Sequence, residues 1–462
     1  MASGFRNCRS RRNWPKTVTS DRDIAVEGAD QIAELFSRFL LDRGHVATVV
    51  QVRMLSGGRS VLTMHLELDS TDPSVPADVV LQVQQSAGPT SGVADVRRQF
   101  ELIGLARSRG LPVAAPLWCS TDLRHLGSPF LVTSLVKGVA LDPFRRDDGP
   151  VLAELASDSG LRSSIVNNLV SLHSIAASDL PDSARLPLDT SPVVHEIDRW
   201  TNVIAASRFS KDPVLLYAER WLRQNEPRGQ RRSLVHGDYR LGNFIVGDGD
   251  VVAILDWEFA GEGDPLLDVG MLSSPTVVAG ERFDGLWRKG EFARLYAERA
   301  GVEISPEALR YYIVLAAFKV AGLWVNSTRT AGHGAMSLDI LRAGFSVLTL
   351  RRTLAQVLGL VPQAQRPVSP SARTASAALK LRDGSRDSAL FTSIARALLE
   401  RPPFEQELEF WSRYATWVGS SGQAAPVDLA QVAARLLDAP PDDATARDLL
   451  AQAAELPFAM WP

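Results

Sequence analysis

Cysteine is nearly absent from this sequence. The 462 residues include two cysteines, Cys8 and Cys119, which lie far apart. Two isolated thiols cannot build a disulfide framework, and neither they nor the scattered histidines have the spacing of a zinc site. We therefore expect a protein of a reducing, cytoplasmic compartment that does not depend on disulfides or structural zinc.

Excess charge and long apolar runs are also missing. The formal net charge is −3, with 22% charged and 45% hydrophobic residues. Such a balance gives no electrostatic reason to expect nucleic acid or an anionic membrane as a partner. No uninterrupted apolar run approaches the roughly 20 residues of a membrane span. The basic residues 1–24 lack the apolar segment of a signal peptide, so we expect a disordered arm there.

The length of the chain predicts more than one domain, and residues 25–138 predict a small α+β lobe. Apolar positions at helical spacing indicate helices, and runs of β-branched residues indicate strands. The expected helices are 28–43 and 93–108, and the expected strands are 49–55, 61–68, 79–83, 114–119 and 130–136.

Residues 139–360 predict a second lobe that is mostly helical. Its expected helices are 161–177, 193–206, 213–224, 283–300, 306–326 and 337–359. Residues 361–377 are rich in Pro, Ser, Ala and Gln, which is typical of a linker. Residues 378–462 carry helical stretches that are sufficient for a small all-helical accessory domain, and association of two chains through it stays open.

One segment, residues 234–270, concentrates polar residues that a hydrophobic core does not need. A histidine, six Asp, two Glu and an Asn surround two short apolar runs, 244–246 and 251–255. The runs are separated by Gly-Asp-Gly-Asp, which predicts a tight β-hairpin. The acidic residues therefore fall on loops beside the strands, where a rigid scaffold can direct them at a ligand, and we expect a metal–phosphate site.

The order of three residues in this segment matches the needs of phosphoryl transfer. Asp238 and Asn243 are five positions apart, which is the spacing of the catalytic loop of protein kinases. Asp256 directly follows the second apolar run, 251–255. A carboxylate can orient an attacking hydroxyl while an amide oxygen and a second carboxylate hold magnesium. Each residue alone is better explained as a turn or cap, but the set in this order favours a catalytic site.

These motifs resemble the aminoglycoside phosphotransferase (APH) family of choline-kinase-like enzymes, in particular its acyl-CoA-dehydrogenase-associated branch. The resemblance is strongest in HGDYRLGNFIV and ILDWEFAGEGDPLLDVG and extends more weakly over residues 28–359. It implies a two-lobed protein-kinase-like fold and a kinase that uses ATP and Mg²⁺ to phosphorylate a hydroxyl group of a small molecule. Asp238 matches the catalytic aspartate, and Asn243 and Asp256 match the metal ligands.

The resemblance also suggests supporting roles. His236 matches the histidine of the motif and is expected to brace the loop by hydrogen bonds rather than to carry a proton. Glu258 is either a carboxylate near the substrate or a surface acid beside Trp257. Asp264 and Asp268 are expected to cap the following helix and hold the loop.

The nucleotide side of the site departs from the family pattern. Gly57, Gly58 and Arg59 resemble the glycine-containing loop that lies over the phosphates. The basic residue expected on strand 79–83 is Gln82, and its glutamate partner on the next helix is Gln99. Two amides can still hydrogen-bond each other, but the nucleotide's phosphates lose a positive charge.

Three explanations remain for this departure. In the first explanation, the alignment with the family is displaced by one residue. Against it, no Lys or Arg occurs between Ser60 and Arg97. Alternatively, Arg59 replaces the missing cation, or it is a solvated arginine of a hairpin tip. In the third explanation, phosphoryl transfer is weakened and the protein is a nucleotide- or ligand-binding pseudokinase. The intact set Asp238, Asn243 and Asp256 favours an enzyme over this alternative.

The acceptor cannot be read from the sequence. Its site should lie on the helices of residues 190–225 and 275–345. An acidic groove there would indicate a cationic aminoglycoside, and an apolar groove with a basic rim would indicate a hydroxyacyl thioester.

Overall fold

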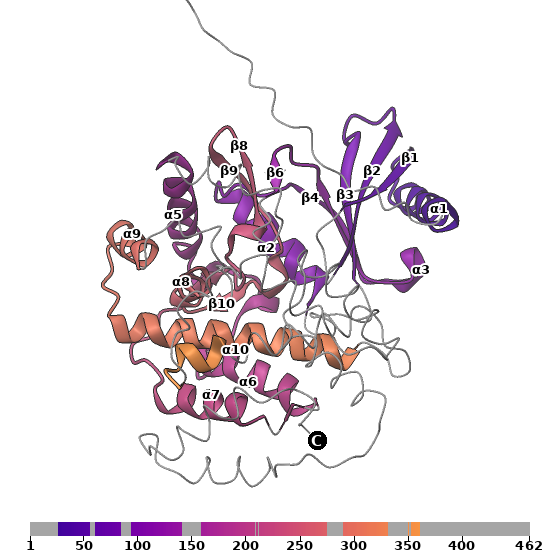
Figure 1. Ribbon diagram of the computed structural model, residues 1–462. Coiled ribbons are helices and arrows are strands. Elements are labelled where there is room, and N and C mark those ends of the chain that lie inside the picture. The colour runs from indigo at the N-terminus through magenta and orange to yellow at the C-terminus, as the bar shows by residue number, and fades with distance from the viewer. Residues whose placement is uncertain are drawn as a thin grey trace, which may run out of the picture.

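The computed structural model describes residues 26–360 except 56–60, 85–93, 141–158, 208, 211, 275–289, 331–349 and 351–352. Within these residues the chain forms a small lobe around a five-stranded sheet and a larger, mostly helical lobe (Figure 1). This is the expected two-lobed architecture. The predicted N-terminal arm, the linker and the C-terminal helical domain lie outside the described residues.

The small lobe follows the predicted order of elements. Its helices and strands are α1 (Val26–Asp42), β1 (Ala47–Met54), β2 (Val61–Ser70), β3 (Asp78–Gln84), α2 (Val96–Ser108), β4 (Pro116–Ser120), α3 (Leu123–Leu126) and β5 (Phe130–Ser134). The strands pair antiparallel in the order β1-β2-β3-β5-β4. The four-residue helix α3 was not predicted, because so short a helix has no detectable periodicity.

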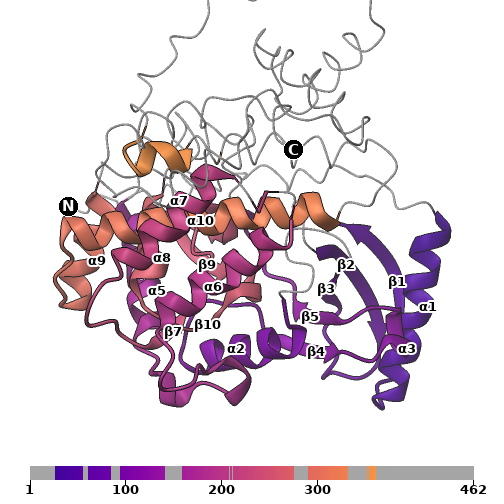
Figure 2. The same ribbon diagram turned by 90° about the horizontal axis from the view of Figure 1, so that it is seen from below.

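The core of this lobe lies on one face of the sheet. Phe36 and Phe39 of α1 pack edge-to-face on Phe130 of β5, with ring centroids 6.2 and 5.0 Å away. Alternate residues of β3, namely Val79, Leu81 and Val83, are buried in the same cluster. Because side chains alternate along a strand, Gln82 points to the opposite face. In Figure 2, α1 covers the outer side of the sheet, and α2 lies between the sheet and the large lobe.

The large lobe contains predicted helices with short strands between them, although most of the predicted helix 337–359 and residues 283–289 of another lie outside the described residues. Its elements are β6 (Val139–Ala140), α5 (Ser159–His173), α6 (Pro192–Ala205), α7 (Pro213–Gln224), β7 (Ser233–Val235), β8 (Phe244–Gly247), β9 (Asp250–Ile254), β10 (Gly261–Gly263), α8 (Leu266–Ser273), α9 (Glu291–Ala300) and α10 (Pro306–Thr330). Ser191 and Asp212 cap α6 and α7 with their side-chain oxygens. The strands β6, β7 and β10 were not predicted, since two or three residues carry no alternation.

Helix α10 is the centre of the large lobe, and α6, α7 and α8 pack around it (Figure 1). Residues Pro306–Asn326 are long and apolar enough to cross a membrane by length and composition alone, and 61% of this window is buried in the protein. Glu307, Arg310 and Lys319 interrupt this stretch, so it contains no uninterrupted apolar run of that length. The apolar composition is explained by helices packing on several sides of α10.

The acidic segment forms the expected hairpin. Strands β8 and β9 pair antiparallel, and Asp248 and Gly249 form the turn between them with φ angles of 51° and 80°. Two consecutive residues with positive φ are characteristic of a type I′ turn, which favours Asp-Gly. The hairpin fixes the two loops at its base, one before β8 and one after β9.

Candidate active site

The first loop, between β7 and β8, is held from below by one buried carboxylate. Both oxygens of Asp268 accept backbone N–H bonds at 2.7 Å, from His236 and from Gly237. Gly237 has φ 77°, and a Cβ there would lie 2.7 Å from the carbonyl oxygen of Phe259. The loop therefore needs both the carboxylate beneath it and a glycine at its apex.

A second buried histidine orients Asp268. His173 Nε2 donates to Asp268 Oδ2 at 3.0 Å, and His173 Nδ1 lies 2.8 Å from the hydroxyl of Tyr296. Burial alone would raise the pKa of the Asp268 carboxyl, but its bonds to His173 and to the loop amides hold that pKa below the ordinary value. Asp268 was expected to hold the loop, and the structure shows these contacts.

His236 is completely buried and joins the two loops. Its Nε2 donates to the carbonyl of Leu255 at 2.8 Å, and its Nδ1 accepts the backbone N–H of Asp238 at 3.2 Å. These bonds require the neutral ring with its proton on Nε2. Burial lowers the pKa of His236. The geometry is that of the expected brace.

Asp238 and Asn243 lie together on the first loop. Asn243 Nδ2 donates to the carboxylate of Asp238 at 2.8 Å and to its carbonyl at 2.9 Å. Arg240 Nε donates to the same carboxylate at 2.9 Å. One carboxylate oxygen of Asp238, Oδ2, is thus held by two donors.

Asp256 follows β9 on the second loop. Leu255, which precedes it, donates its N–H to the carbonyl of Asn243, so the two loops are joined in register. Asp256 has φ 59° and ψ 60°, a left-handed conformation that few residues other than Gly, Asn and Asp adopt. Asp256 is exposed to solvent, yet desolvation by the surrounding protein raises its pKa; nearby Arg240 opposes this shift, and Asp238 reinforces it.

The donor set fits a magnesium ion bound with phosphates. Asn243 is completely buried, and its Oδ1 has no hydrogen-bond partner. A buried amide oxygen without a partner is costly unless it ligates a cation. Within the described residues no three His, Cys, Asp or Glu side chains gather as a cation site. Asn243 and Asp256 would hold Mg²⁺ together with phosphate oxygens, as is usual for this ion.

The hydrogen bond that Gln82 and Gln99 could form with each other is not present. Among the hydrogen bonds of the described residues, none joins these two side chains. Strand β3 is tied to the start of α2 by Gln84 instead, whose Nε2 donates to the carbonyl of Ala94 at 2.9 Å. Gln99 is buried, with 9% of its surface exposed. Two neutral amides lack the long-range attraction that draws an ion pair together.

The remaining predicted residues have separate places. Asp264 accepts the N–H groups of Leu266 and Arg231, both at 2.8 Å, so it caps α8 and holds the chain before β7. Glu258 is buried, with 8% exposure, which disagrees with a surface acid beside Trp257. Gly57, Gly58 and Arg59 lie outside the described residues.

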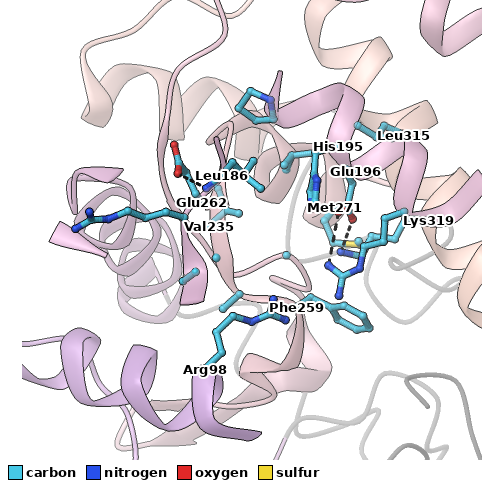
Figure 3. Close-up of a pocket in the computed structure, with 18 of the residues that line it drawn as sticks. Arg98, Leu186, His195, Glu196, Val235, Phe259, Glu262, Met271, Leu315 and Lys319 are labelled. Atoms are coloured by element: carbon cyan, nitrogen blue, oxygen red, sulfur yellow. Dashed lines mark hydrogen bonds and ion pairs between the residues drawn. The ribbon is translucent and has the colours of Figure 1, made fainter. Parts of the chain in front are cut away.

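Beside the loop that carries Asp238 lies a cavity of about 250 Å³, which the sequence did not reveal (Figure 3). Gly237 and Phe259 line it, and these residues flank Asp238 and Glu258 in the sequence. The cavity wall also contains charged side chains from three separate helices, namely Arg98, Glu196, Arg199 and Lys319. A lysine within the apolar residues 306–326 was the one sequence signal that could have indicated a polar site there.

The charged wall is organised around Glu196 of α6. Its carboxylate lies 2.9 Å from Lys319 Nζ and 3.8 Å from Arg199 Nη1, and it accepts the indole N–H of Trp200. Burial alone would raise the pKa of Glu196, but Lys319 and Arg199 lower it to about 2. Lys319 also lies 4.5 Å from the centre of the Phe259 ring.

Two lobes, an Asp–Asn loop and an aspartate after the following hairpin define a phosphotransferase of the kinase-like class. The sequence pattern of the phosphotransferase enzyme family (APH) matches residues 51–304. The chain therefore belongs to this family, whose members act on small molecules.

Similar proteins agree with this assignment. The chain is 28% identical over 247 residues to acyl-CoA dehydrogenase family member 11 of Mus musculus, covering 49% of the chain and 30% of that protein. Member 10 of Mus musculus is 26% identical over 269 residues, 53% of the chain and 24% of that protein. The chain thus spans about a quarter to a third of these relatives. A crystal structure of a putative aminoglycoside phosphotransferase from Ralstonia eutropha shares the fold, with a TM-score of 0.53 at 21% identity, covering 70% of the chain and 97% of that structure.

Proposed function

We propose that this protein transfers the terminal phosphoryl group of ATP to a hydroxyl group of a small molecule. The observation that carries the proposal is the pairing of Asp238 with Asn243, whose buried Oδ1 lacks a hydrogen-bond partner. A carboxylate set beside a cation-ready amide oxygen is the arrangement that phosphoryl transfer requires.

Each residue of the site has a distinct task. Asp238 orients the acceptor hydroxyl and takes its proton as the oxygen bonds to phosphorus and ADP leaves. Asn243 and Asp256 would hold Mg²⁺, which would supply charge compensation for the phosphates. Arg240, bonded to Asp238 and close to Asp256, adds positive charge beside them. His236 and Asp268 keep the two loops in place.

A second candidate function is a catalytically weak, nucleotide- or ligand-binding pseudokinase. The observation in its favour is that Gln82 and Gln99 carry no charge and do not bond to each other. Positioning and charge stabilisation supply nearly all the catalysis of phosphoryl transfer, so a lost cation reduces the rate.

One experiment separates the two candidates. ADP formation is measured with ATP and Mg²⁺ over a panel of hydroxylated metabolites and aminoglycosides, for the wild-type protein and for Asp238→Asn. Asp189→Asn is the matched control, because Asp189 is exposed, does not line the cavity and takes part in no ion pair recorded for the described residues. An acceptor-dependent rate that Asp238→Asn abolishes supports the kinase. ATP binding by thermal shift without any acceptor-dependent turnover supports the pseudokinase.

A further inference from the structure

The cavity beside the catalytic loop belongs to the acceptor side of the site. Its walls come from α6, β10, α8 and α10 of the large lobe, with Arg98 of α2 as the contribution of the small lobe. The strand β3, which carries Gln82, does not line it. The cavity is therefore separate from the surface on which the family places the nucleotide.

Positive charge outnumbers negative charge on this wall. Arg98, Arg199 and Lys319 line the cavity together with the carboxylate of Glu196. Figure 3 shows Glu196 beside Lys319. The second carboxylate, Glu262, forms an ion pair with Arg232, which is not a lining residue, and accepts the N–H of Leu186. Arg185 is directed elsewhere, toward Asp182 and the carbonyl of Ser178. Among the charged residues that line the cavity, the cations Arg98, Arg185, Arg199 and Lys319 thus outnumber the carboxylates Glu196 and Glu262.

Arg98 is the least compensated of these cations. Its Nη2 donates to the carbonyl of Glu258 at 3.3 Å, and its Nε is buried without a partner. No carboxylate of the described residues lies within ion-pair distance of its guanidinium. Burial and the charge of Arg199 lower the pKa of Arg98, and the more distant carboxylates of Asp95 and Glu196 oppose this shift. A partly buried cation without a counter-ion is costly, and a bound anion removes that cost.

We propose that this cavity binds the acceptor and that Arg98, backed by Lys319 and Arg199, holds an acidic group of it. The group is a carboxylate or a phosphate ester. The apolar lining from Val235, Leu267 and Leu315 receives a short apolar part of the same molecule. This inference rests on the proposed function and specifies its substrate class: a small hydroxylated acid rather than a cationic aminoglycoside or amino alcohol, which the excess positive charge would repel.

The first arm of the test measures turnover. ADP formation is followed with matched acceptors: 3-hydroxybutyrate and its methyl ester, glycerol 3-phosphate and glycerol, and choline and kanamycin. The acids should have higher kcat/KM than their neutral counterparts, and choline and kanamycin should have the lowest values. A cationic or neutral acceptor with higher kcat/KM than every acid overturns the inference while the proposed kinase function stands.

The second arm uses variants of α2. Arg98→Gln should raise the KM for an acidic acceptor about 10- to 100-fold, because charge-assisted hydrogen bonds to its carboxylate or phosphate are lost. Arg98→Lys should have a KM between those of Arg98→Gln and the wild type. Arg97→Gln is the matched control, since Arg97 is exposed on the same helix and does not line the cavity. The KM of the neutral counterpart should not change in Arg98→Gln.

The third arm measures anion binding without catalysis. Thermal stabilisation by malonate and by inorganic phosphate is compared with chloride at equal ionic strength. Wild type and Arg97→Gln should be stabilised more than Arg98→Gln. Equal stabilisation of Arg98→Gln overturns the inference. If no acceptor is phosphorylated and ATP does not bind, the proposed kinase function fails, but this arm still decides whether the cavity is an anion site.

Discussion

The side-chain amide of Asn243 donates both to the carboxylate and to the carbonyl of Asp238, at 2.8 and 2.9 Å. With its nitrogen engaged in this way, the amide turns its Oδ1 away from Asp238. That oxygen is buried and has no hydrogen-bond partner. One side chain therefore positions the proposed catalytic carboxylate and presents the proposed metal ligand.

The first prediction concerns this amide. Asn243→Ala should lower ATP turnover about 100-fold or more, because it removes a cation ligand and a bond that holds Asp238. The thermal shift caused by ATP should lose the part that depends on Mg²⁺ and keep the part that does not. Asn225→Ala, an exposed amide at the end of α7, is the control and should retain both. A Mg²⁺-dependent shift that persists in Asn243→Ala would show that this residue is not a metal ligand.

The second prediction concerns the carboxylate beneath the loop. Asp268→Asn replaces one carboxylate oxygen by an NH₂ group. This group then faces the N–H donors whose hydrogen bonds the oxygen had accepted. Hydrogen bonds to a charged group contribute roughly 1.5–3 kcal/mol each, so the free energy of unfolding should fall by about 3 kcal/mol or more. Urea unfolding of Asp268→Asn measures the loss. Asp250→Asn, on the exposed end of the hairpin, should stay close to wild type.

The third prediction concerns pH. The pKa of His236 lies below its ordinary value of 6.5 in the folded protein, so the unfolded chain binds the proton more tightly. The contribution of neutral His236 to the free energy of unfolding is therefore fully present above pH 6.5. It is lost as the pH falls below 6.5, at up to about 1.4 kcal/mol per pH unit. Thermal unfolding between pH 8 and pH 5 should show this loss in the wild type.

The comparison for this prediction is His236→Gln, which has no group that titrates in the window. Its stability should be lower at pH 8 and should fall less between pH 7 and pH 5. His195→Gln, in which both bracing bonds of His236 remain, should follow the wild type. Parallel pH profiles for wild type and His236→Gln would show that His236 does not set the acid sensitivity.

The sequence predicted the loops of the site because their information is local. The Asp-Gly turn fixed the hairpin, and the hairpin brought Asn243 and Asp256 to the same end. The spacing within 234–270 therefore sufficed to group Asp238 with both. The roles assigned to these residues remain predictions, since the structure gives their geometry and not their chemistry.

The cavity was not predictable in the same way. Arg98, Glu196 and Lys319 come from helices that are far apart in the sequence. Helical periodicity shows which face of a helix is apolar, but it does not show which other helix meets that face. The absence of a hydrogen bond between Gln82 and Gln99, which their side chains could form, was not predictable for a related reason. A strand and a helix can be assigned from the sequence, whereas the distance between two of their side chains depends on packing.

The last prediction concerns the missing charge of the small lobe. Gln82 lies on the face of β3 opposite the core formed by Val79, Leu81 and Val83, so a lysine there would not disturb that core. The double variant Gln82→Lys and Gln99→Glu should restore an ion pair across β3 and α2 and lower the KM for ATP about tenfold. Gln82→Leu with Gln99→Leu is the control, because it leaves the site uncharged and should not improve ATP use. If the charged variant shows the same KM as the wild type, another cation already compensates the phosphates, and Arg59→Ala and Arg240→Gln, measured for ATP KM, then identify which of the two it is.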